Sequence, residues 1–154
     1  MSTIAKDSAK GSTQNTGKDY WSEQYVMAEH WQSDLKFDED ELRFLKKLID
    51  KYFLWLIDEK HLENTRKVAN RLSHFEKDRL EIDTRVGKHM HHLVALIENS
   101  SLPNASACES EHNTLRNALA DLQMELRAVK KEIFQLAEHV MDSNKARRLL
   151  ESAG

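Results

Sequence analysis

The chain has 154 residues, with 23 Lys plus Arg against 26 Asp plus Glu and a formal net charge of −3. Its 4 Gly and 1 Pro compare with about 11 and about 8 at average usage. This deficit excludes sandwiches and barrels with frequent turns, and enzymes built on glycine-rich phosphate loops, while the charge balance excludes a binder of nucleic acid that relies on many cation–phosphate contacts. With 32% charged and 40% hydrophobic residues, the composition predicts an all-α protein of long helices.

The first 37 residues divide into two segments. Residues 1–18 are mostly Ser, Thr, Gly, Lys, Asn and Ala with almost nothing to bury, so we expect a disordered tail. Residues 19–37 are rich in aromatic side chains at helical spacing, which predicts a short amphipathic helix. The positions that carry this pattern are Trp21, Tyr25, Ala28, Trp31 and Leu35. A helix this short needs a surface to lie on, so we interpret 19–37 as a docking segment that packs either on the surface of residues 42–57 or on a partner.

A helix start is predicted at Asp38. Asp38 and Glu41 have the spacing of a capping box, and Phe37 and Leu42 occupy the two positions of a hydrophobic staple. Apolar residues then cover two faces up to residue 57, which predicts a helix over 38–57 that is covered on two sides. The first face carries Leu42, Leu45, Ile49, Tyr52 and Leu56, and the second carries Phe44, Leu48 and Trp55.

The apolar stripe stops at residues 58–64, where neither Gly nor Pro is present. Either the chain reverses there, or one helix continues with a change of phase. We favour the reversal, because it would bury large side chains of the preceding helix within one chain. These side chains are Phe44, Tyr52, Phe53 and Trp55.

Two further helices are predicted over 62–98 and 107–151, each with apolar residues in alternating steps of four and three. The first stripe is Val68, Leu72, Phe75, Arg79, Ile82, Val86, His89, Leu93 and Leu96. The second is Leu115, Leu119, Leu122, Leu126, Val129, Ile133, Leu136 and Val140. This spacing is typical of left-handed coiled coils. The predicted fold is therefore a long antiparallel helical hairpin or three-helix bundle with coiled-coil heptads, preceded by the disordered tail.

The connection between these two helices is predicted as a loop over 99–106. Pro103 lies within it, and Ser106 with Glu109 has the spacing of a second capping box. Arg79 interrupts the first stripe. It is either a buried polar residue that fixes register or a snorkelling side chain whose head reaches water, and we favour the second interpretation.

Candidate metal ligands gather near the hairpin loop. His89 and His92 share a face of one helix, Cys108 and His112 share a face of the next, and Cys and His are good zinc ligands. If the hairpin centres near residue 103, however, Cys108 lies about 9 Å further along the axis than His92. The favoured interpretation is that His89 is a tolerated polar residue of the stripe and that the others are surface residues.

The sequence therefore favours a non-enzymatic interaction or scaffold protein that self-associates or holds a helical partner, with no cofactor. The candidate partner-binding residues are the aromatic anchors Trp21, Tyr25, Trp31 and Trp55. The alternative is a small helical-bundle metal or ligand binder that uses His89, His92, Cys108 and His112. The longest apolar run has six residues where a membrane span needs about 20, and no signal peptide is recognised. With a single cysteine, the expected location is the cytoplasm.

Overall fold

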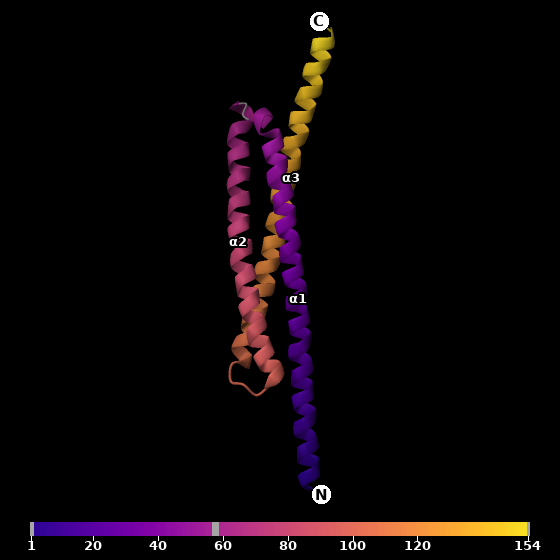
Figure 1. Cartoon of the computed structure of the whole chain (residues 1–154), viewed down its shortest axis with the longest axis vertical. Coiled ribbons are helices and arrows are strands. Elements are labelled where there is room, and N and C mark those ends of the chain that lie inside the picture. The colour runs from indigo at the N-terminus through magenta and orange to yellow at the C-terminus, as the bar shows by residue number, and fades with distance from the viewer. Residues whose placement is uncertain (1, 57–58, 154) are drawn as a thin grey trace. The chain divides into compact units, whose positions relative to one another are not determined.

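The computed structural model describes the backbone of residues 2–56 and 59–153. Side chains are described for residues 16–51, 62–142, 148 and 150–152. The described chain forms three long helices: α1 (Ser2–Leu56), α2 (Glu59–Glu98) and α3 (Ala105–Ala153). Between the last two, residues 99–104 make the short connecting loop (Figure 1). The all-α prediction is confirmed, and no strand is present in the described residues.

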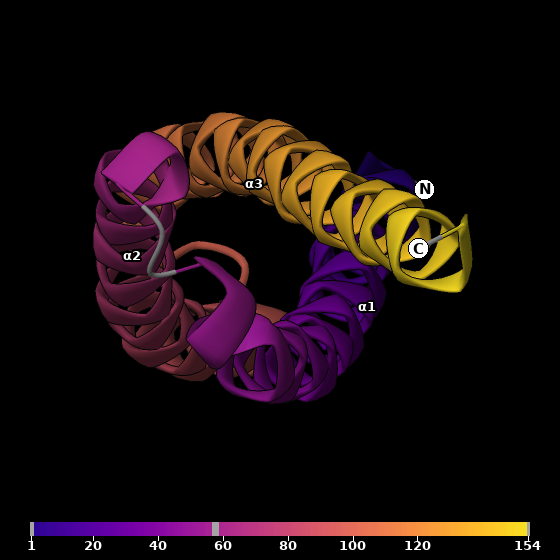
Figure 2. The same ribbon diagram turned by 90° about the horizontal axis from the view of Figure 1, so that it is seen from above.

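The chain divides into two compact units, each with one segment of every helix. Unit 1 comprises Met1–Lys36 and Leu80–Ala120, and unit 2 comprises Phe37–Arg79 and Asp121–Gly154. In each unit, three helical segments pack around a shared apolar core, and Figure 2 shows the three helices as separate coils. The three-helix arrangement is thus present in both units, whereas left-handed supercoiling remains a prediction.

The predicted helix start at Asp38 is wrong, because α1 runs without interruption through this position. The Asp38 side chain is 2% exposed, and its carboxylate accepts a hydrogen bond of 2.5 Å from the amide of Gln123 on α3. Phe37 is 63% exposed while Leu42 is buried, so they form no staple. Asp38 continues the buried stripe of α1 in steps of four and three, and its acceptor groups serve a tertiary contact.

Helical backbone also extends through most of residues 1–18, since α1 begins at Ser2. Disorder was expected there from composition alone. A helix that is already nucleated extends at one hydrogen bond per residue fixed, so the buried aromatic segment behind it favours extension. The end of this segment packs closely: a Cβ added at Gly17 would lie 2.9 Å from the Cβ of Ser100. Glycine therefore allows α1 to approach the hairpin loop in unit 1.

The predicted reversal of the chain between α1 and α2 is confirmed, but its predicted position at residues 58–64 is wrong, because α2 begins at Glu59 and residues 59–64 are helical. Lys46 Nζ on α1 lies 2.7 Å from Glu76 Oε2 on α2, although an unbroken helix of 30 residues would separate them by about 45 Å. One reason for favouring the reversal was wrong, because Phe44 is 55% exposed. The other three aromatic side chains of that argument lie outside the described residues.

The two stripes of the hairpin form the cores of the units. All nine positions of the α2 stripe and all eight of the α3 stripe are buried, including Leu126 at 3% exposure and Val129 at 0%. Arg79 departs from the favoured snorkelling interpretation, because its side chain is only 7% exposed and Nη2 lies 3.7 Å from Glu39 Oε2. The α1 segment covers this face of α2, so the guanidinium is enclosed.

The second predicted capping box is also absent. Helix α3 begins at Ala105, and the Cys108 amide donates to the Asn104 carbonyl at 2.9 Å, so Ser106 already lies within the first turn. The carboxylate of Glu109 instead accepts a hydrogen bond of 3.2 Å from the Tyr20 hydroxyl. In both failed capping boxes, the acidic side chain contacts another helix of its unit.

Candidate metal centre

Five polar side chains of unit 1 meet near the hairpin loop, and we call them the histidine cluster. Helix α2 supplies His89 and His92, which are three residues apart, and α3 supplies Cys108, Glu111 and His112 at positions i, i+3 and i+4. Residues at these spacings share one helix face. The antiparallel hairpin turns the two faces toward each other, which brings the five side chains together.

His89 lies at the centre of the cluster. Its Nδ1 is 2.5 Å from Glu111 Oε1 and 3.9 Å from Cys108 Sγ, while its Nε2 is 2.8 Å from His112 Nδ1. His92 Nδ1 approaches the same Glu111 oxygen at 2.9 Å. One carboxylate oxygen therefore joins two imidazoles, and a thiol lies beside the first of them.

Most of this cluster is enclosed by the bundle. His89, Cys108 and His112 are 0%, 3% and 2% exposed, whereas Glu111 is half-buried and the His92 side chain is 49% exposed. Helix α1 closes the cluster with Trp31, whose ring centroid is 4.5 Å from that of His112 and 6.4 Å from that of His89. The cluster is buried on the His112 side and exposed to solvent on the His92 side.

Burial holds the inner histidines neutral. Loss of solvation lowers the pKa of His112 to about 4, and the neighbouring His89 and Arg116 act in the same direction. Burial also lowers the pKa of His89, and it outweighs the opposing effect of the Glu111 carboxylate. Neutral imidazoles are the form that coordinates a metal ion.

The thiol and the carboxylate respond in opposite directions. Burial, with a contribution from Glu111, raises the pKa of the Cys108 thiol to about 11, so it is protonated at neutral pH. Burial also acts to raise the pKa of Glu111, but the hydrogen bonds and charges of His92 and His89 prevail and lower it. Glu111 is thus an ionised acceptor between two imidazoles.

One ring nitrogen of the cluster has no protein partner. His112 Nε2 is buried and lies within hydrogen-bonding distance of no protein donor or acceptor in the described part of the chain. An unsatisfied buried nitrogen costs about 1–3 kcal/mol. The other ring nitrogen, His112 Nδ1, contacts His89 Nε2. The ring of His112 therefore makes the contact with the central imidazole while its own Nε2 stays unsatisfied.

Three ligand atoms of the cluster already surround a common point. The atoms from His89, Cys108 and Glu111 all lie within 4.8 Å of one another. Tetrahedral zinc holds nitrogen and sulfur ligands about 3.5 Å apart and nitrogen and oxygen ligands about 3.3 Å apart. The thiol–imidazole distance is therefore slightly long, and the Glu111 oxygen has to move by about 1 Å, away from His89 Nδ1 and toward Cys108 Sγ. The partly exposed side chain of Glu111 allows that movement.

The structure changes the sequence-based view of these residues. Cys108 and His112 are core residues, not surface residues. The pairing of His89 with Glu111 and His112 places the hairpin centre near residue 100, and not near 103. In an antiparallel hairpin, moving the centre by three residues shifts the facing position on the partner helix by six residues, which is about 9 Å. That shift removes the distance that separated Cys108 from the histidines.

Glu111 was missed by the sequence analysis. The signal that identifies it is the spacing Cys108-x-x-Glu111-His112, which places three potential ligands on one face of α3. The sequence argument set this face aside because it placed Cys108 about 9 Å further along the axis than His92. Of the four residues predicted as ligands, the structure brings His89 and Cys108 to the common point, places His92 on Glu111 and places His112 behind His89.

The predicted partner-binding aromatics are mostly turned inward. Trp21 is 6% exposed, Tyr25 and Trp31 are half-buried, and Trp31 contacts the histidine cluster. The docking segment therefore packs on α2 and α3 of its own chain in unit 1. Trp55 lies outside the residues whose side chains are described.

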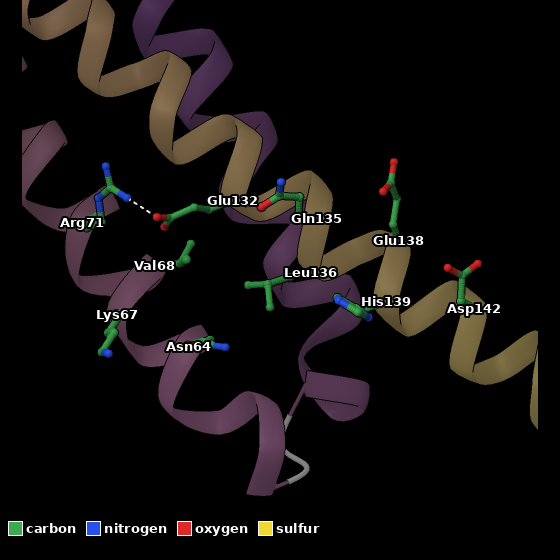
Figure 3. Close-up of a pocket in the computed structure, with 10 residues that line it drawn as sticks. All are labelled: Asn64, Lys67, Val68, Arg71, Glu132, Gln135, Leu136, Glu138, His139 and Asp142. Atoms are coloured by element: carbon green, nitrogen blue, oxygen red, sulfur yellow. Dashed lines mark hydrogen bonds and ion pairs between the residues drawn. The ribbon is translucent and has the colours of Figure 1, made fainter.

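A separate pocket of about 750 Å³ lies between α2 and α3 in unit 2 (Figure 3). Val68 and Leu136 face each other across it, and Arg71 reaches from α2 to Glu132 on α3. Arg71 is also 3.0 Å from Glu125. Two carboxylates thus neutralise the guanidinium, so the pocket holds no spare cation from Arg71 for an anionic ligand.

No protein family model, no curated protein and no solved structure matches this chain. Among the described residues, no helix carries an apolar stretch long enough to cross a lipid bilayer.

Proposed function

We propose that this protein is a metal-binding helical bundle whose histidine cluster takes up a single zinc ion. The observation that carries the proposal is the convergence of His89 Nδ1, Cys108 Sγ and a Glu111 oxygen within 4.8 Å of one another. Thiolate, imidazole and carboxylate are the three ligand types that zinc accepts in proteins. This was the alternative function suggested by the sequence, and the geometry now favours it.

His92 supplies the fourth ligand in this proposal. Its Nδ1 is 2.9 Å from the Glu111 oxygen, and its exposed ring is free to turn toward the ion. Four protein ligands make a closed site, which is the arrangement of structural zinc sites and leaves no position for a substrate. The proposed role of the ion is to join α2 to α3 in unit 1.

Zinc binding at neutral pH has to displace the thiol proton of Cys108. The raised pKa of about 11 opposes this step, so the affinity depends on pH and each ion that binds releases a proton. The ion also takes the place of the proton that His89 Nδ1 now donates to Glu111. Because the Cys108 thiol is uncharged before zinc binds, no anion at Cys108 has to be desolvated in the metal-free protein.

The test is a zinc titration of the untagged full-length protein against a chromophoric chelator. We expect one ion per chain and at least a tenfold loss of affinity in Cys108→Ser, which keeps the side-chain volume but removes the sulfur ligand. His91→Ala is the control, because His91 is an exposed histidine of α2, the helix that carries His89 and His92. Absence of zinc binding, or equal losses in both variants, would refute the proposal.

A second candidate function is self-association, the interaction role that the sequence favoured. Three phenylalanines of unit 2 remain exposed, namely Phe37 at 63%, Phe44 at 55% and Phe134 at 40%. Phe37 and Phe44 are seven residues apart, so they share one face of α1. Light scattering of the protein and of a Phe37→Ser/Phe44→Ser double variant tests this role. A mass of one chain for both proteins would count against it.

A further inference from the structure

We infer that His112 is a positioning residue for the metal: it accepts a hydrogen bond from His89 Nε2–H and thereby presents His89 Nδ1 to the ion. This inference rests on the proposed function, and it assigns a role to the one buried histidine that faces away from the ligand atoms. It also explains why a half-satisfied polar ring is kept in an apolar core.

The contacts fix which His89 nitrogen faces which partner. Nδ1 points to Glu111 and Cys108, and Nε2 points to His112 Nδ1 at 2.8 Å. An ion can bind only a nitrogen without a proton, so a metal at Nδ1 moves the ring proton to Nε2. Nε2–H then requires an acceptor, and His112 Nδ1 is the atom in place.

The metal-free protein has the opposite hydrogen-bond direction. A carboxylate only accepts, so His89 Nδ1–H donates to Glu111, and a neutral His89 accepts at Nε2 from His112 Nδ1–H. When zinc takes Nδ1, the His89 proton moves to Nε2 and the His112 proton moves to its own Nε2. Both rings keep one proton each, so the exchange is balanced, and only the Cys108 proton leaves the site.

Trp31 holds His112 in this position. The two rings lie 4.5 Å apart between centroids with an interplanar angle of 33°, with His112 buried and Trp31 half-buried in unit 1. Metal-bound histidines are usually oriented by a hydrogen bond at their second nitrogen, and loss of that partner costs about 10- to 100-fold in metal affinity. In this chain, α1 therefore contributes to the site without supplying a ligand.

Two substitutions at one position separate positioning from packing. His112→Phe keeps a flat ring against Trp31 but removes the acceptor, whereas His112→Asn places an amide oxygen near the position of Nδ1. We expect zinc affinity to fall by about 10- to 100-fold in His112→Phe and to stay within about threefold of the parent in His112→Asn. The cobalt(II) absorption spectrum should change only in His112→Phe, because His89 is then free to turn.

Folding is checked by helical circular dichroism and thermal unfolding of each metal-free variant. A His112→Phe protein that is as stable as the parent but binds zinc weakly supports positioning. Equal zinc affinities of the parent and His112→Phe would overturn the inference while leaving the zinc site intact. An equal loss in His112→Asn and His112→Phe would also overturn it. A parent protein that binds no zinc would refute the proposed function itself.

A direct measurement avoids substitution at the site. Nitrogen-15 chemical shifts of the zinc-loaded protein report which ring nitrogen carries the proton. We expect His89 to be protonated at Nε2 and His112 at Nε2, and the metal-free protein to show both rings protonated at Nδ1. A His89 ring that binds zinc through Nε2 would overturn the inference.

Discussion

Acid should destabilise the metal-free protein through the buried histidines, beginning well above the range in which carboxylates titrate. Burial holds the pKa of His112 at about 4, against 6.5 for an ordinary imidazole. Between these two values the unfolded chain binds more protons than the folded chain, so the free energy of unfolding falls as the pH falls. The contribution is fully present above about pH 6.5 and is lost progressively toward pH 4.

The size of the effect follows from the two pKa values. Each unit of difference is worth about 1.4 kcal/mol, so the loss between about pH 7.5 and pH 5 is at most about 2 kcal/mol from His112 alone. The lowered pKa of His89 acts in the same direction. The lowered pKa of Glu111 adds to the loss only below its ordinary value of 4.5, which separates the two kinds of group.

Urea unfolding in the presence of a chelator measures this dependence. We expect the parent to lose about 2 kcal/mol between about pH 7.5 and pH 5, and His112→Phe to show a clearly smaller loss, because it has no proton to bind at this position. An equal pH dependence in the two proteins would refute the reasoning, since it would mean that His112 titrates normally in the fold.

Three further predictions concern the helix propensity of α2, the buried stripe of α3 and the Cys108 thiol. Gly87→Ala should stabilise α2 by up to about 1 kcal/mol, because an added Cβ at residue 87 meets no atom within 4 Å; a lower melting temperature would contradict this. Leu126→Ala should lower the free energy of unfolding by about 2–5 kcal/mol. Met124→Ala, at a position that is 67% exposed, should lower it little. Equal losses in the two variants would show that the stripe is not the core. Cys108 should react slowly with iodoacetamide in the native metal-free protein and rapidly after unfolding, because the thiol is buried and its pKa is about 11.

The sequence predicted the helical core well because burial in long helices follows a simple period. Leu126 and Val129 were identified as core residues from the four–three spacing alone, and the same spacing correctly placed His89 inside. The stripe records which face of a helix is covered. It does not record which residue of the neighbouring helix lies opposite.

The predictions of the helix ends and of the site were wrong for that reason. Asp38 with Glu41 has the local pattern of a cap, yet Gln123 and Lys130 on α3 engage the two carboxylates, and these contacts are invisible in one sequence. The site depended on the hairpin register, which a six-residue loop leaves free by several residues. In the register that the structure shows, Cys108, Glu111 and His89 converge.

X-ray absorption at the zinc edge of the loaded full-length protein shows whether the histidine cluster binds zinc through Cys108. We expect one sulfur neighbour at about 2.3 Å and three nitrogen or oxygen neighbours at about 2.0–2.1 Å, with the sulfur signal lost in Cys108→Ser. A zinc ion surrounded only by nitrogen and oxygen in the parent protein would refute zinc binding through Cys108.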